Sequence, residues 1–176
     1  MFYKALSITI SSKILTKSNK LKYSDITKYK LSMNEYRILK GIAVVFEEQK
    51  DTQKAIDIYS AILSSLESDT ASYEIQKKQL PTIYFNLSNA LIDDKQYTNA
   101  LDVVNKGIKF CSDTKELKTI AYLLWNKGKS IFFLGDKKLA VESFQHAYNY
   151  FKYTENEQRL NDFKTTAKTK YNISLQ

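Results

Sequence analysis

Apolar residues recur along this chain at spacings of three and four positions, which is the period of an amphipathic helix. The clearest case covers residues 117–151, with the sequence LKTIAYLLWNKGKSIFFLGDKKLAVESFQHAYNYF. Its apolar stripe is interrupted at Leu134, Gly135 and Asp136. A Gly can adopt the left-handed conformation that ends one helix, and an Asp can cap the start of the next. The pattern therefore predicts two antiparallel helices joined by a tight turn.

A fixed spacing of small and large residues within this helix pair recurs twice upstream. A small residue is followed by Ala twelve positions later, by a larger residue four positions after that, and by another core residue three further on. The three copies of this register are Gly128, Ala140, Phe144 and Ala147; Ser88, Ala100, Val104 and Gly107; and Ala43, Ala55, Tyr59 and Ile62. The register resembles the tetratricopeptide repeat, a helical hairpin of about 34 residues. We therefore expect an all-α fold, a tetratricopeptide-repeat-like right-handed superhelix of antiparallel helix pairs, with 45 and 40 residues between successive Ala positions.

Start and stop signals set the expected helix boundaries. Ser32, with Glu35 three positions later, forms a capping box, and Asp51 can cap the helix that follows. A polar break at 68–72 ends that second helix. Pro81 either kinks the next helix or lies in the first turn of a new one.

These signals place a single domain over residues 1–176, without an internal linker. Its last helix pair is expected to begin at Ser112 or Asp113. A terminal helix with a polar outer face then closes the stack, as helical repeats require. We expect about eight helices, arranged as repeats at about 33–68, 81–112 and 117–152, with flanking helices within 2–31 and 156–172.

Composition limits the chemistry that the chain can perform. His146 is the only histidine and Cys111 is the only cysteine, so a Ser-His-Asp catalytic set and a zinc site have too few candidate residues. We therefore expect no enzyme, no metal site and no cofactor. A single cysteine fits a reducing, cytoplasmic compartment, where Cys111 would be a small core residue. No apolar run approaches the ~18 residues of a membrane span.

The net charge of +8 is concentrated at the start of the chain, where residues 1–50 contain ten Lys or Arg against four Asp or Glu. A basic surface can attract nucleic acid or an acidic peptide. We interpret most of these lysines as a solvated surface, because they do not alternate with aromatic residues on one face, as a nucleic-acid site would need.

In a stack of helix pairs, the first helix of each pair lines a concave groove, and the resemblance to tetratricopeptide repeats assigns certain positions to that groove. Those positions hold our candidate peptide-binding residues: Phe85, Asn86, Asn89, Tyr122, Asn126, Lys129, Arg37 and Lys40. An Asn amide can pair with both the N–H and the C=O of an extended peptide. Basic side chains can receive a carboxylate, and aromatic rings can receive apolar side chains. The alternative for the asparagines is that they tie neighbouring helices together or face water.

Three stretches make the resemblance more specific: IYFNLSNAL, NALDVVNKGIKFC and YLLWNKGKSIFFLGDKKLAVESF. From about Leu31 to Leu175 the chain resembles the C-terminal repeat domain of Rgg/PlcR-type (RNPP-like) peptide-sensing transcriptional regulators. The resemblance implies a quorum-sensing domain that binds a short signalling peptide on its concave face and forms a homodimer. Asn86 and Asn126 would be its groove asparagines, with Asn89 as a further candidate.

Regulators of this family carry a DNA-binding helix-turn-helix ahead of the repeat domain, whereas the first 31 residues here hold at most two helices. We therefore expect DNA binding only through a helix-turn-helix that this sequence does not contain. The alternative is a stand-alone interaction scaffold, or an antagonist of such a regulator, whose groove holds the tail of another protein. A homodimer is expected through the C-terminal helices, which carry more aromatic residues than one closing helix need bury: Tyr148, Tyr150, Phe151, Tyr153 and Phe163.

Overall fold

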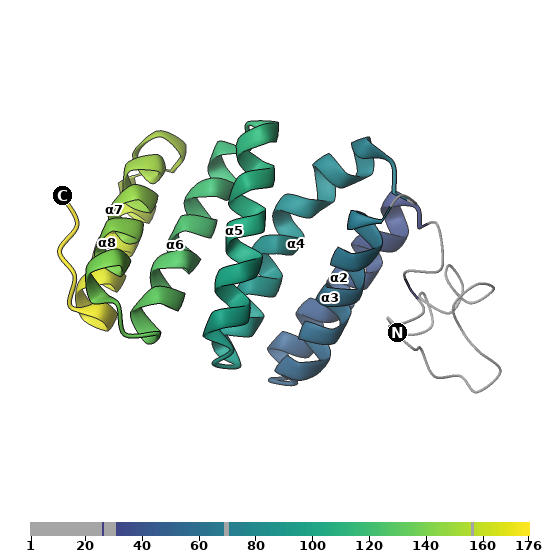
Figure 1. The fold of residues 1–176 in the computed structure, drawn as a ribbon, viewed down its shortest axis with the longest axis horizontal. Coiled ribbons are helices and arrows are strands. Elements are labelled where there is room, and N and C mark those ends of the chain that lie inside the picture. The colour runs from purple at the N-terminus through teal and green to yellow at the C-terminus, as the bar shows by residue number, and fades with distance from the viewer. Residues whose placement is uncertain (1–25, 27–30, 69–70, 156) are drawn as a thin grey trace. The chain divides into compact units, whose positions relative to one another are not determined.

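The computed structural model describes residues 26, 31–68, 71–155 and 157–176, and these residues form seven α-helices and no strand (Figure 1). The helices are α2 (Met33–Glu48), α3 (Thr52–Glu67), α4 (Tyr73–Asp93), α5 (Tyr97–Thr114), α6 (Leu117–Phe133), α7 (Lys137–Thr154) and α8 (Glu157–Tyr171). The predicted all-α fold, with consecutive helices packed as in a tetratricopeptide-like repeat, is confirmed. The flanking helices expected within 2–31 lie outside the described residues. None of the described helices is both long and apolar enough to cross a lipid bilayer.

The chain divides into two compact units, and the boundary between them lies inside α4, after Ile83. We call the residues up to Ile83 the first unit and those from Tyr84 the second unit. Pro81 lies within the continuous helix α4 and does not begin a new helix. Leu80, Ile83 and Tyr84 are buried beside it, and their packing offsets the hydrogen bond that a proline removes. The expectation of a single domain over 1–176 stays a prediction.

The first unit is built around the pair α2–α3. The predicted capping box is confirmed, because the N–H of Ser32 donates to Glu35 Oε2 (2.6 Å) and the N–H of Glu35 donates to Ser32 Oγ (3.4 Å). Asp51 caps α3 by accepting a hydrogen bond from the N–H of Lys54 (3.4 Å). All residues of the register in this pair are fully buried: Ala43, Ala55, Tyr59 and Ile62.

The second unit is built around the pair α6–α7, which is joined by the turn that the sequence predicts. Gly135 has a φ of +100°, and Asp136 accepts a hydrogen bond from the N–H of Leu139 (3.0 Å). The two helices approach closely because position 128 lacks a side chain. A Cβ on Gly128 would lie 2.8 Å from Cδ1 of Phe144, which is shorter than real side chains allow. The predicted small-to-large packing is therefore confirmed.

The middle copy of the register shows a second close approach. A Cβ on Gly107 of α5 would lie 2.7 Å from Cβ of Tyr84 on α4. Ser88, Ala100 and Val104 are fully buried. The spacing found in the sequence thus corresponds to buried helix contacts in all three copies.

One helix boundary differs from the prediction. α5 continues to Thr114, where Lys115 adopts the left-handed conformation (φ +61°) that ends the helix. The prediction that Ser112 or Asp113 starts the next helix is therefore wrong. Cys111 is fully buried. The apolar stripe of α5 therefore extends one turn further than expected from the polar residues that follow Cys111.

A short segment after α8, residues 172–176, completes the core of the second unit and runs beside α7 (Figure 1). We call it the C-terminal strap. Its Ile173 and Leu175 are buried in the core. The N–H of Gln176 donates to Gln145 Oε1 (3.1 Å), and Gln145 Nε2 donates to the carbonyl oxygen of Gln176 (2.8 Å). One amide side chain of α7 thus pairs with both backbone groups of one strap residue.

Candidate functional site

The candidate groove residues are divided between the two units. Arg37 and Lys40 lie on α2 in the first unit, where Arg37 is exposed and Lys40 is half-buried. Burial lowers the pKa of Lys40, and the nearby charge of Arg37 lowers it further. The other six candidates lie in the second unit on α4 and α6, and the geometry below concerns these: Phe85, Asn86, Asn89, Tyr122, Asn126 and Lys129.

Two polar contacts join α4 and α6 at this surface. Asn126 Nδ2 donates to Ser88 Oγ (2.8 Å), and Lys129 Nζ donates to Asn89 Oδ1 (3.0 Å). Asn126 is only 1% exposed. The amide of Asn126 therefore ties α4 to α6, which is one of the alternatives considered for it. Its predicted part in peptide binding stays a prediction.

The asparagines of α4 keep some access to solvent. Asn86 and Asn89 are half-buried and lie three positions apart on α4, which places them on one face of the helix. Lys129 of α6 is half-buried beside Asn89. These three side chains form a partly exposed polar surface, and we call it the α4–α6 polar surface.

An aromatic wall adjoins the α4–α6 polar surface. The rings of Phe85 and Tyr122 meet edge to face at 5.4 Å, and the hydroxyl of Tyr122 donates to Glu155 Oε1 (2.9 Å). Burial and the hydrogen bond to the Glu155 carboxylate raise the pKa of Tyr122. Lys118 forms an ion pair with the same carboxylate (3.2 Å). The ring of Tyr122 is thereby fixed in place and can serve as an apolar contact surface.

A cavity of about 400 Å³ opens on the other side of Lys129. Its wall comes from the end of α4, the following turn, the start of α5, the middle of α6 and the end of α8, and it comprises Ile92, Asp93, Lys95, Tyr97, Trp125, Lys129, Phe133, Thr166, Lys170 and Tyr171. Burial lowers the pKa of Lys129 to about 8, and the charge of Lys170 lowers it while that of Asp93 opposes the change. The cavity thus combines aromatic walls with a lysine whose charge is poorly solvated.

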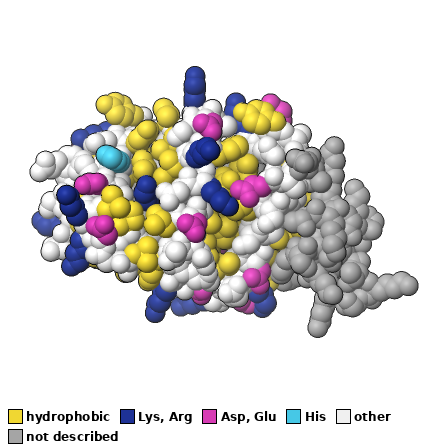
Figure 2. All heavy atoms as spheres, in the orientation of Figure 1, with side chains coloured by type: hydrophobic (Ala, Val, Ile, Leu, Met, Phe, Trp, Pro, Cys, Tyr) yellow, Lys and Arg dark blue, Asp and Glu magenta, His cyan; other side chains and the backbone are white. Residues whose placement is uncertain are grey.

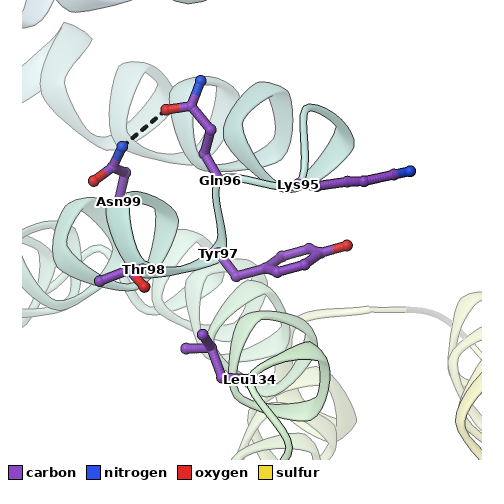
Figure 3. A pocket seen from close by; sticks show the side chains of 6 residues that line it. All are labelled: Lys95, Gln96, Tyr97, Thr98, Asn99 and Leu134. Atoms are coloured by element: carbon purple, nitrogen blue, oxygen red, sulfur yellow. Dashed lines mark hydrogen bonds between the residues drawn. The ribbon is translucent and has the colours of Figure 1, made fainter.

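A shallower hollow of about 300 Å³ shares Lys95 and Tyr97 with this cavity (Figure 3). Lys95 and Tyr97 point to the same side in Figure 3, away from the hydrogen bond between Asn99 and Gln96. The ring of Tyr97 stacks on Phe133 with centroids 4.8 Å apart. This stacked pair forms a rigid edge between the hollow and the cavity.

Sequence reasoning missed the contribution of α8. Thr166 and Lys170 are four positions apart and therefore share one face of α8 with Tyr171 beside them, and all three line the cavity. The groove positions were assigned within the three repeats, whereas α8 belongs to none of them. The signal available in the sequence was the pair Thr166 and Lys170, four positions apart, with the aromatic Tyr171 beside them.

The aromatic surface predicted for dimerisation is smaller than expected. Tyr148 and Phe151 are buried within the chain, and Phe163 stacks on Phe151 at 3.7 Å. Those three residues are needed to attach α8 to α7. Tyr150 and Tyr153 are exposed, the latter by 89%, and with two polar neighbours they line a surface hollow of about 250 Å³.

Groups with catalytic potential are poorly placed for chemistry. His146 is exposed on α7. Cys111 is buried, and burial raises the pKa of its thiol to about 12, so the reactive thiolate is scarce at neutral pH. Among the described residues, no three His, Cys, Asp or Glu side chains lie close enough together to hold a metal ion.

Comparison with known protein families identifies a match over most of the chain. The model of the RNPP family C-terminal domain matches residues 6–172, which is most of the chain. No curated protein and no solved structure matches significantly.

Proposed function

Because the chain belongs to the RNPP family, as a C-terminal domain of that family, we propose that it binds a short peptide and regulates transcription in response. The family is a family of regulatory helical domains and not one of enzymes. The proposal assigns the peptide to the second unit, along the α4–α6 polar surface.

The observation that carries this proposal is the α4–α6 polar surface itself. Asn86, Asn89 and Lys129 are half-buried polar groups in a row, between the aromatic wall of Phe85 and Tyr122 and the cavity. Amide side chains at half-buried positions can hold the backbone of a peptide, while the flanking rings accept its side chains. In this proposal the buried Asn126 supports the surface through its hydrogen bond to Ser88.

A library of free-acid hexapeptides tests the proposal by thermal shift. A peptide that binds only the folded chain stabilises it by about 2.7 kcal/mol at one hundred times its Kd, which raises Tm measurably. For a peptide found in this way, Asn86→Ala and Asn89→Ala should each weaken binding by about tenfold, the effect of losing one or two hydrogen bonds.

Matched controls are available on α5, where Asn105 and Lys109 are exposed. Asn105→Ala should leave the affinity for the same peptide unchanged. Lys109→Ala should also leave it unchanged, and this variant is the control for Lys129→Ala. A wild-type chain stabilised by no peptide of the library, or equal affinities in the α4 and α5 variants, would contradict the proposal.

A role in transcription has a separate test. The coding sequence upstream of Met1 should encode an in-frame helix-turn-helix if this chain is the sensing part of a regulator. If none is encoded there, a stand-alone scaffold or antagonist becomes the better account, and the peptide site is unaffected.

We also propose a homodimer that uses the exposed part of α7. Leu139, Tyr150 and Tyr153 expose apolar surface along one face of this helix, and Figure 2 shows apolar side chains reaching the surface in patches between charged ones. A symmetric partner could cover such surface. Light scattering at tens of micromolar should give twice the monomer mass, and Tyr153→Lys should return it to the monomer. A monomer mass for the wild type at that concentration would contradict the dimer.

A further inference from the structure

The cavity beside Lys129 is too small for a whole peptide. Its volume of about 400 Å³ lies near the lower end of the roughly 300–1,000 Å³ of small-molecule pockets. It therefore suits one residue of a peptide, or one residue and part of the next. The walls decide which kind of residue.

The charges at the cavity favour an anion. Lys95, Lys129 and Lys170 line it against one carboxylate, that of Asp93. Asp93 is exposed, so solvent weakens its repulsion of an incoming anion. The balance is positive, with the half-buried ammonium of Lys129 as its least solvated charge.

Within the described residues, the ammonium of Lys129 has no carboxylate within 4 Å, and its one hydrogen bond goes to Asn89 Oδ1. An ammonium has three donors, and a desolvated charge without a counter-ion is unfavourable. A ligand carboxylate would supply the missing counter-ion in a low-dielectric place, where such a pair is strongest.

Apolar groups stand next to this charge. Trp125 is only 7% exposed, and its ring lies in the cavity wall. Phe133 and Tyr171 meet at a ring distance of 6.3 Å on the same wall. An apolar or aromatic side chain fits against these rings while a carboxylate on the same residue or its neighbour faces Lys129.

We infer that this cavity is a subsite for a carboxylate carried next to an apolar or aromatic group. The inference rests on the proposed function in that it names which part of a peptide the cavity takes. The carboxylate can be the C-terminus of the peptide or the side chain of an Asp or Glu beside an apolar residue.

Binding of such a carboxylate is coupled to a proton. The pKa of Lys129 in the free chain is about 8, and an adjacent carboxylate raises it. Near pH 8 the complex therefore takes up a proton, and the affinity falls as pH rises above 8. The other groups that face Lys129 are Asp93 on α4, Lys95 on the turn, Tyr97 on α5, and Lys170 and Tyr171 on α8. The pKa of Tyr171 is raised by burial and by the negative charge of Asp93.

N-acetyl-phenylalanine and its amide are the probes for the subsite, because they differ only in the carboxylate. Trp125 is the only tryptophan of the chain, so its fluorescence reports occupancy directly. At pH 7 the acid should bind about tenfold or more tightly than the amide, the range expected of a charge-assisted hydrogen bond. At pH 9.5 the difference should shrink several-fold.

Three variants separate the charge from the fold. Lys129→Gln should abolish the preference for the acid, Lys129→Arg should retain it at both pH values, and Lys109→Gln on the exposed face of α5 should leave it unchanged. An acid and an amide of equal affinity in the wild type, or a preference that survives Lys129→Gln, would overturn the inference.

A blocked dipeptide distinguishes the source of the carboxylate. N-acetyl-glutamyl-phenylalaninamide carries a side-chain carboxylate and no free C-terminus, and a Lys129-dependent affinity for it assigns the subsite to an acidic side chain. Dependence only with N-acetyl-phenylalanine assigns it to the C-terminus. If peptides found in the library bind equally well as C-terminal amides and show no preference for acidic residues, the inference fails while peptide binding stands. If no library peptide binds but the acid probe does so through Lys129, the subsite stands and the proposed function fails.

Discussion

The helix pairs α2–α3 and α6–α7 fill the same register in two ways. In the first unit the register combines the buried Ala43 with a fully buried tyrosine, Tyr59, whose hydroxyl donates to Glu47 Oε2 (2.9 Å). In the second unit, Gly128 lies directly against the ring of Phe144. A tyrosine needs a polar partner for its buried hydroxyl, whereas a phenylalanine needs only space. The absence of a Cβ at position 128 provides that space, so the close approach of α6 and α7 depends on a glycine.

The two units also differ in the polar groups around the repeat pattern. Among the described residues of the first unit, Tyr36 and Ser65 share a buried hydrogen bond (2.8 Å). In the second unit, Asn126 donates to Ser88, and a cavity has Lys129 in its wall. The same repeat pattern therefore specifies apolar packing in both units, whereas the polar residues around it differ.

The largest effect is expected from the ring that lies on Gly128. Phe144→Ala should lower the free energy of unfolding by about 3–5 kcal/mol, because a fully buried ring is replaced by a void. Tyr59→Phe in the first unit should cost less, about 1.5–3 kcal/mol, the value of one hydrogen bond to a charged group. Urea denaturation measures both, and a loss below 2 kcal/mol for Phe144→Ala would contradict the packing described for α6–α7.

A pair of glycine substitutions tests whether a close helix contact exists at Gly128 and not at Gly41. Gly128→Ala should cost about 1–3 kcal/mol, since the added methyl overpacks the Phe144 ring. Among the described residues, no side chain or neighbouring helix comes within 4 Å of a Cβ added to Gly41 in α2. Gly41→Ala should therefore stabilise by up to about 1 kcal/mol through helix propensity alone. Stabilisation by both substitutions in urea denaturation would show that the close contact at Gly128 is absent.

The buried lysine of the cavity predicts a pH dependence of stability. The pKa of Lys129 is about 8 in the folded chain and about 10.4 in an unfolded one. Between these values the unfolded chain holds a proton that the folded chain lacks, so stability should rise with pH across this window. We expect a rise on the order of 1–2 kcal/mol relative to Lys129→Met, allowing for partial solvent exposure. Denaturation at pH 7.5 and 10 measures it, and parallel curves for the two proteins would refute it.

The smallest effect concerns the polar tie between α4 and α6. Asn126→Ala should cost about 0.5–1.5 kcal/mol, because Ser88 Oγ keeps its hydrogen bond to the carbonyl oxygen of Phe85 (2.8 Å). Peptide affinity should persist in the remaining folded protein. A tenfold loss of affinity with unchanged Tm would instead place the Asn126 amide in the groove.

Much of the fold can be read from the sequence because its signals are local. The capping box at Ser32, the turn at Gly135 and the start of α8 at Glu157 depend on residues within a few positions of one another, and each lies where the spacing predicts it. The end of α5 does not, because the helix continues past the fully buried Cys111 to Thr114. The polar residues at 112 and 113 give no sign of this continuation.

The site was harder to predict for a related reason. Spacing along one helix tells which residues share a face, but not which neighbouring helix that face meets. Asn126 therefore occupied a groove position in the pattern, yet its amide is buried against Ser88. The cavity draws Lys170 and Tyr171 from α8, and no repeat pattern could connect that helix with Lys129 beforehand.

The C-terminal strap would compete with any free peptide for its binding site on α7. Gln145 pairs with both backbone groups of Gln176, and Lys152 Nζ adds a bond to the same carbonyl oxygen (3.2 Å). The site on α7 thus holds the main chain of the strap, in addition to the burial of its Ile173 and Leu175 side chains. A segment tethered to its site acts at an effective concentration on the order of millimolar. A free peptide of equal intrinsic affinity at micromolar concentration would therefore displace the strap from only about one molecule in a thousand.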